Sequence, residues 1–190
     1  MIMQYHNVLT PMDFPMNPLQ NIDYVLNLFD LKSTNDQVLH LDDSILKLEV
    51  KNLINNSDLI IEKINVWRWS IDRQKLEPPH TDGNYRGSKR LVGLNWVLDD
   101  NNTGVEFYDV DHGTPQFKKE TDKKHYTNWQ FPIGTIPLVV WNNKVPSLIN
   151  PQSPHHIIGP NGTFRHSMTI KFLGNPSYDF VLEKLDKFVL

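Results

Sequence analysis

Short apolar segments separated by turn-forming residues dominate the sequence after residue 58, and they constrain the fold more than any other feature. They lie at residues 59–70, 90–98, 105–108, 136–141, 155–158 and 164–172. Most are rich in β-branched and aromatic side chains, which is typical of strands. Strands at this spacing, without helices between them, favour a sandwich or barrel over a parallel α/β sheet. The proximity of segments 90–98 and 105–108 predicts a hairpin.

Amphipathic helices are expected on either side of this region. Residues 21–29 carry apolar side chains at helical spacing, and a second helix is expected to begin near residues 42–44, where Asp and Ser are suitable N-caps. A weaker helical pattern spans residues 178–189. The length of 190 residues fits one domain.

We therefore predict a single domain, mostly β with flanking helices (α+β), over residues 1–190. A helical part at 1–58 would precede a double-stranded β-helix core, a jelly roll of the cupin-like kind, at 59–172. A C-terminal helix would complete the chain at 173–190.

The absence of cysteine limits the chemistry that the chain can perform. Disulfides, thiolate metal sites, iron–sulfur clusters and cysteine nucleophiles are excluded, so any metal must be bound by histidine and carboxylate. The formal net charge of −3 gives no electrostatic basis for binding nucleic acid or an anionic membrane.

The distribution of apolar residues predicts a soluble, cytoplasmic protein. The N-terminus lacks the basic start and apolar stretch of a secretion signal. The most apolar run, residues 136–141, is too short to cross a membrane. The sequence contains no alanine and is rich in Asn, Lys and Ile, which indicates an A/T-rich genome such as that of a phage or a small-genome bacterium.

Two potential metal ligands, His80 and Asp82, are separated by one residue in the segment Pro-Pro-His-Thr-Asp-Gly. Residues two apart in an extended strand point to the same side, so an imidazole and a carboxylate could bind one ion together. The tripeptide is a weak signal by itself, because a solvated turn whose aspartate caps a backbone amide has the same pattern.

A third ligand is expected from the adjacent pair His155 and His156. Neighbours on a strand face opposite ways, so only one of the two can face the first motif. We favour His155, because Ile157 would lie on the same face and form a wall of the site; His156 is the alternative. Two histidines and one carboxylate on one side of a metal leave other coordination positions open, as in non-haem iron(II) oxygenases.

Arg165 and Ser167 are expected to share one face of the strand at 164–172. Both could reach a carboxylate, since arginine offers a rigid fork of donors for that group. An arginine that points into a β barrel requires an anionic partner; the alternative is a surface arginine on an edge strand. Asn95, in the middle of another strand, could line the same site or be locally hydrogen-bonded.

Three residues of the strand at 59–70 have less specific roles. Trp67 and Trp69 share one face and are interpreted as core residues. Arg68, between them, would face the other way, towards the site. Residues 118–125 form a mildly basic loop, which we interpret as solvated.

Together these residues resemble the iron(II)/2-oxoglutarate-dependent dioxygenase superfamily and its prolyl-hydroxylase-like double-stranded β-helix. The order His-x-Asp (His80 and Asp82), a later His (His155) and then Arg-x-Ser (Arg165 and Ser167) is the signature of that family.

The resemblance covers residues 64–172 and not the first third of the chain. It implies that the three ligands bind iron(II), that 2-oxoglutarate chelates the iron through its 1-carboxylate and 2-keto oxygens, and that Arg165 with Ser167 binds the far carboxylate. Asn95 would line the cosubstrate site. Dioxygen would then oxidise a C–H bond of the substrate, with release of succinate and CO2.

Two other functions fit parts of the sequence. Two histidines and an aspartate also bind zinc, so a metal-dependent hydrolase or isomerase on a cupin barrel is one alternative. A carboxylate clamp made by Arg165 and Ser167 has no role in such an enzyme. A non-catalytic jelly-roll binding module is the other alternative. For the dioxygenase, a peptide side chain or a small metabolite is the expected substrate, and the sequence leaves the oligomeric state open.

Overall fold

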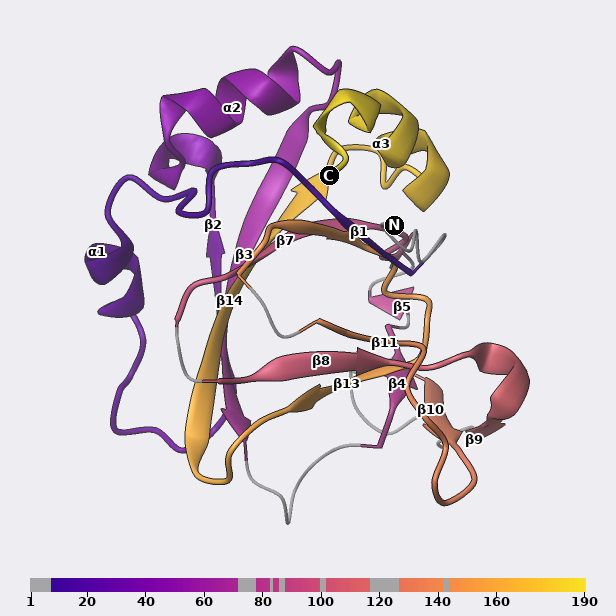
Figure 1. Ribbon diagram of the computed structural model, residues 1–190. Coiled ribbons are helices and arrows are strands. Elements are labelled where there is room, and N and C mark those ends of the chain that lie inside the picture. Colours follow the sequence, from indigo (N-terminus) through magenta and orange to yellow (C-terminus); the bar gives the residue numbers. More distant parts are fainter. Residues whose placement is uncertain are drawn as a thin grey trace.

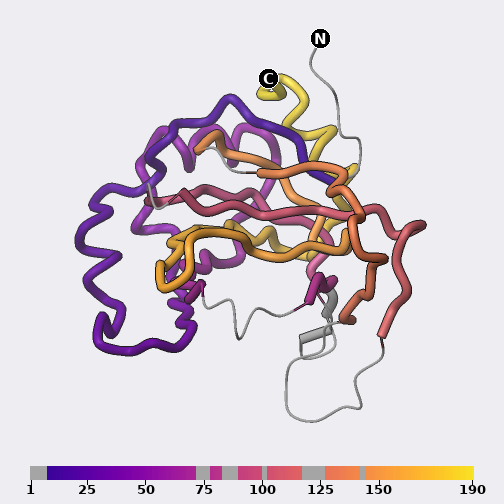
Figure 2. The backbone as a smooth tube through the Cα atoms, turned by 60° about the horizontal axis from the view of Figure 1, so that its bottom comes forward, coloured from indigo at the N-terminus to yellow at the C-terminus, as the bar shows by residue number. Residues whose placement is uncertain are grey.

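Two six-stranded antiparallel sheets lie face to face in this computed structural model, with helices on the outer side of one of them (Figure 1). The structure describes residues 8–71, 78–82, 84–85, 88–99, 102–116, 127–141 and 144–190. Figure 2 shows the N-terminal segment, in indigo and purple, curving around the outside of the sheets. The fold is therefore mostly β with a few helices, as the sequence predicts. The basic stretch at 118–125 lies outside the described residues.

The first sheet is built around its two longest strands, which pair with each other along almost their whole length. Its order is β1 (Leu9–Pro11), β12 (Ser147–Ile149), β7 (Gly93–Val97), β14 (Thr163–Phe172), β3 (Ile61–Ile71) and β2 (Gln37–Leu41). The long strands β3 and β14 confirm the strands expected at 59–70 and 164–172.

The second sheet consists of shorter strands and carries the His-x-Asp motif. Its order is β11 (Val139–Trp141), β8 (Gly104–Phe107), β13 (His155–Ile158), β4 (His80–Thr81), β10 (Thr127–Gln130) and β9 (Thr114–Gln116). A separate ribbon pairs β5 (Asn84–Tyr85) with β6 (Ser88–Lys89). Strand β13 confirms the expected strand at 155–158.

The helices are short, and a capping side chain precedes two of them. The helices are α1 (Ile22–Leu26), α2 (Leu48–Asn55) and α3 (Tyr178–Lys184), with 3₁₀ turns at Asp43–Ile45, Val110–His112 and Asp186–Phe188. Asn21 caps α1 and Ser177 caps α3 through their side-chain oxygens. None of the described helices is long and apolar enough to span a membrane.

Each face of the first sheet contributes to a different hydrophobic cluster. The outer face packs Ile64, Leu94 and Met168 against apolar residues of the helical segments. The inner face meets the second sheet in a smaller cluster made of Val8, Leu9, Val97, Val105, Phe107, Trp141 and Ile149. Because side chains alternate along a strand, residues such as Arg165 and Ser167 face the second sheet while Met168 faces the helices.

The part predicted as helical, residues 1–58, also contains two strands. Helices are present near the expected positions, but β1 and β2 of the same stretch form the two edges of the first sheet. Strand β1 pairs with β12, and β2 pairs with β3. In the C-terminal part, α3 ends at Lys184 and a 3₁₀ turn follows it.

The predicted hairpin between segments 90–98 and 105–108 is wrong, because β7 and β8 lie in different sheets. The chain crosses between the sheets after Leu98, whose backbone N–H donates to the carbonyl of His166 (2.9 Å). The carboxylate of Asp99 then accepts the backbone N–H of His166 (2.6 Å) and lies 2.7 Å from its Nδ1. These contacts hold the start of the crossover on β14, so the chain cannot turn back beside β7.

The expected orientations on β3 are reversed with respect to the site. Arg68 lies on the helical side, where it donates to the carbonyl of Ser33 (2.8 Å) and stacks over the ring of Phe164. Trp67 and Trp69 stack on each other with ring centroids 4.8 Å apart. They pair with Ser167 and Arg165 across the sheet, and thus lie on the face turned to the second sheet. They are partly exposed and belong to neither cluster of buried core residues.

We expect Leu94→Ala to lower the free energy of unfolding by about 2–5 kcal/mol, the usual cost of a large-to-small change in a packed core. Leu94 is fully buried at the centre of the first sheet. The matched change Val140→Ala, at a side chain that is 40% exposed, should stay within about 0.5 kcal/mol. Urea unfolding measures both; equal effects would contradict this assignment of the core.

Candidate metal centre

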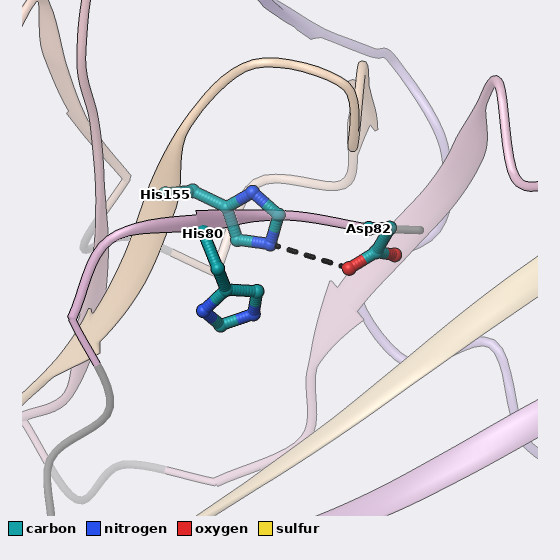
Figure 3. Close-up of side chains that lie close together, drawn as sticks. All are labelled: His80, Asp82 and His155. Carbon is teal, nitrogen blue, oxygen red and sulfur yellow. Dashed lines mark ion pairs between the residues drawn. The ribbon is translucent and has the colours of Figure 1, made fainter. Parts of the chain in front are cut away.

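Two strands of the second sheet bring the predicted ligands together. His80 lies on β4 and Asp82 directly follows it, while β13 carries His155. In the antiparallel pairing of these strands His155 stands directly opposite His80. Figure 3 shows both imidazoles and the carboxylate turned towards one another. Among the described residues this is the one group of His, Asp and Glu side chains close enough to hold a metal ion.

The spacing of the three side chains suits a single ion. One ligand atom from each residue lies within 4.8 Å of the others. Nε2 of His155 is 3.8 Å from Oδ1 of Asp82, and the two imidazole centroids are 4.9 Å apart. Nitrogen and oxygen ligands lie about 2.0–2.2 Å from a bound metal, so small side-chain movements would close the group on an ion.

Backbone carbonyls orient the two imidazoles. Nδ1 of His155 lies 2.8 Å from the carbonyl oxygen of Ser153, and Nδ1 of His80 lies 3.3 Å from that of Pro78. A protonated Nδ1 that donates to a carbonyl leaves Nε2 as the metal-binding nitrogen, which is the usual arrangement around a histidine ligand. The donor set is therefore two imidazole nitrogens and one carboxylate oxygen, and it fits iron(II) or zinc.

Two residues that the sequence did not indicate hold Asp82 in place. Oδ2 of Asp82 forms an ion pair with Arg90, while Oδ1 is the oxygen that faces His155. The side-chain amide of Gln152 donates to the backbone carbonyls of Asp82 (2.7 Å) and Arg90 (2.9 Å). Arg90 thus occupies one carboxylate oxygen and leaves the other directed at the histidines.

The charge states of the ligands match what a metal requires. Burial, together with the charge of His80, lowers the pKa of His155 to about 4, so this imidazole is neutral at neutral pH. Burial raises the pKa of Asp82, but the Arg90 guanidinium, with its hydrogen bond, and the neighbouring imidazoles of His155 and His80 together outweigh burial and hold that pKa below its usual value. Metal ligation needs a neutral imidazole and an ionised carboxylate.

Arg165 reaches across from the first sheet and is 1% exposed. Its Nη1 donates to Oγ1 of Thr103 (3.0 Å), and its guanidinium carbon lies 5.0 Å from the ring centroid of Trp141. Burial lowers the pKa of Arg165 to about 10, opposed by the charge of Asp99, so the side chain is cationic at neutral pH. Its Nη2 is buried without a hydrogen-bond partner in the described part of the chain.

Ser167 and Asn95 lie on the same inner face as Arg165, and their surroundings differ. Ser167 is 8% exposed, two residues along β14. The amide of Asn95 donates to the carbonyl of Gly93 (2.7 Å) and accepts from Oγ1 of Thr169 (2.5 Å). Both ends of this amide are therefore engaged within the first sheet, and direct contact with another ligand would require one of these bonds to break.

His156 lies on the opposite face of the second sheet, away from the cluster. Its Nε2 is 3.4 Å from Oε2 of Glu106, and its ring stacks on Tyr108 with centroids 5.7 Å apart. The hydroxyl of Tyr108 donates to the same Glu106 oxygen (2.6 Å). Of the two adjacent histidines, His155 is thus the one that joins His80 and Asp82.

No protein-family model matches the sequence, and the search of curated proteins finds no significant relative. The case for a function therefore depends on the geometry of the site.

We expect His155→Ala to weaken binding of Co(II), a spectroscopic substitute for iron(II) or zinc, by more than about 100-fold, because loss of a ligand costs more than loss of a supporting residue. The matched control His156→Ala should bind Co(II) as the wild type does. Calorimetric titration of both variants measures the difference. If the two changes weaken binding equally, His155 has no special role.

Proposed function

We propose that this chain is an iron(II)- and 2-oxoglutarate-dependent dioxygenase that hydroxylates a C–H bond of a peptide side chain or small metabolite. One observation carries the proposal: a two-histidine, one-carboxylate group of the second sheet is combined with a buried arginine on the inner face of the first sheet, and Nη2 of this arginine has no partner among the described residues. The first feature suits iron with open positions, and the second suits a bound anion.

We further infer that the two sheets form a double-stranded β-helix. From β3 to β14 the chain repeatedly crosses from one sheet to the other, with β4, β8 and β13 in the second sheet and β7, β12 and β14 in the first. Such crossing between two antiparallel sheets is expected of a jelly roll. Simple hairpins would instead keep consecutive strands within one sheet.

In this proposal the ligands leave one side of the metal open. His80 and His155 would hold the metal through Nε2 and Asp82 through Oδ1, because Arg90 holds Oδ2. If the carboxylate binds through one oxygen, the protein supplies three ligand atoms to the metal. Bound iron(II) and 2-oxoglutarate would supply the oxidising chemistry, in which dioxygen is reduced while the cosubstrate is decarboxylated to succinate.

Arg165 would bind the far carboxylate of 2-oxoglutarate. Its Nη1 is held by Thr103 and its Nη2 is the donor that remains, with the hydroxyl of Ser167 on the same strand face. Arg165 contacts Trp141, a member of the inner apolar cluster that also includes Val105 and Phe107, and this cluster would limit the access of water. A low-dielectric setting strengthens a guanidinium–carboxylate pair, and a metal hydrolase has no use for such a pair.

We expect the wild-type protein, loaded with iron(II) and 2-oxoglutarate in the absence of oxygen, to release succinate slowly once oxygen is admitted. This release should occur even without substrate. His80→Ala and Asp82→Ala should abolish this release because they remove ligands, whereas His156→Ala should retain it. Succinate is measured by chromatography. A wild-type protein that binds iron but neither binds nor consumes 2-oxoglutarate would favour the hydrolase alternative.

We expect Arg165→Met to weaken 2-oxoglutarate binding to the Co(II)-loaded protein by about 100-fold, since charge-assisted hydrogen bonds to the far carboxylate are lost. Arg68→Met is the matched control, because Arg68 is also a buried arginine of the first sheet but faces the helices. It should change the affinity less than about two-fold. Calorimetry gives both constants, and equal losses would mean that Arg165 acts only through the fold.

A further inference from the structure

Asn128 lies beside the proposed metal ligands, and no local sequence pattern indicated it. On β10 it stands directly opposite His80 of β4. The backbone N–H of Trp129 donates to the carbonyl of Pro79 (2.7 Å), so the next pair, Asn128 and His80, is of the non-hydrogen-bonded kind. In such pairs the opposed side chains are closest, with Cα atoms about 4.5 Å apart.

The side-chain oxygen of Asn128 is buried without the hydrogen-bond partner that a buried amide oxygen requires. Asn128 is 6% exposed, and its Oδ1 has no hydrogen-bond partner in the part of the chain that the structure describes. The contrast with Asn95 is direct, because that amide is equally buried but bonded at both ends. An unpaired buried amide oxygen is costly, so its position beside the candidate metal ligands indicates that a bound molecule completes its hydrogen bonding.

The position of Asn128 separates it from the proposed cosubstrate site. The cross-strand pairs form a row on the inner face of the second sheet, which runs through Val139, Phe107, His155, His80, Asn128 and Gln116. Arg165 reaches the apolar end of this sheet, at Trp141 and Thr103. Asn128 is on the other side of the histidines, where the row becomes polar. A molecule bound to Asn128 would approach the metal from the side opposite the arginine.

We propose that Asn128 binds the substrate, and that the group it recognises is a secondary amide next to the carbon that is oxidised. This inference rests on the proposed function. The oxygen of the Asn128 side chain accepts an N–H, and its NH2 donates to a carbonyl. A secondary amide offers both complementary groups, whereas an ester lacks the N–H. A peptide backbone and a small amide-bearing metabolite share this chemistry.

The test uses the Mn(II)-loaded protein, with and without 2-oxoglutarate, and two small probes of nearly equal shape. N-Methylacetamide has the amide N–H, and methyl acetate does not. Bound Mn(II) accelerates the NMR relaxation of methyl protons that come close to it. With the wild-type protein we expect the relaxation enhancement of the methyl protons to be about three- to ten-fold larger for the amide than for the ester. This ratio corresponds to the contribution of one hydrogen bond to binding.

Asn128→Leu should remove this preference while leaving Mn(II) affinity unchanged. Gln130→Leu is the matched control, two residues further along the same strand and exposed, and it should keep the preference. A capped tripeptide as a third probe distinguishes the two sources: tighter binding than N-methylacetamide indicates a peptide, equal binding a small amide, and either supports an amide site.

Equal relaxation of amide and ester by wild type would overturn the inference, without need of any variant. So would an Asn128→Leu protein that binds Mn(II) and still prefers the amide. If the amide preference is present but 2-oxoglutarate does not bind, the cosubstrate assignment fails and the role of Asn128 stands. If Mn(II) itself does not bind, both are wrong.

Discussion

The pairing of β13 with β4 is the constraint on which the metal centre depends, because it sets His155 against His80. A slip of one residue would turn His156 towards the first sheet and His155 away from it. The register is held on the other side of β13 by β8, where Ile157 faces Val105 inside and His156 faces Glu106 outside. A slipped strand would turn His156 and Ile158 inward in place of His155 and Ile157, so the apolar pattern of β13 alone does not fix the register. The contacts of His156 with Glu106 and Tyr108 on the outer face favour the observed pairing.

Asp82 and Arg165 differ in whether the protein supplies a close partner of opposite charge. The chain gives Asp82 a cation of its own, Arg90, and ties both backbones together through Gln152. Arg165 has a threonine hydroxyl and an indole ring as near neighbours, with Asp99 acting on its pKa through space. The candidate metal site is thus arranged by the chain itself, while the guanidinium retains a donor that an anion could use.

Local patterns in the sequence predicted the long strands and which residues face the same way, because alternation is a property of each strand alone. They did not predict which strands pair. The prediction of a hairpin at 90–98 and 105–108 is wrong because Asp99 binds His166 of β14 and so directs the chain to the other sheet. Strand β2 was missed, as it is short and partly exposed. Arg90, Gln152 and Asn128 were missed for the same reason: their roles arise only from contacts between distant segments.

The inner face of the second sheet changes character at the histidines, and in the proposed function this change would place cosubstrate and substrate on opposite sides of the metal. On one side Phe107 and Val105 form part of the inner apolar cluster, where water is scarce and a paired charge is strong. On the other side Asn128 adjoins Gln116, whose side chain donates to that of Gln130 (3.2 Å). A dry side suits a cosubstrate common to every turnover, and a polar side suits the recognition of one substrate. The ligands stand on the boundary, so the metal would contact both without either molecule crossing the other's path.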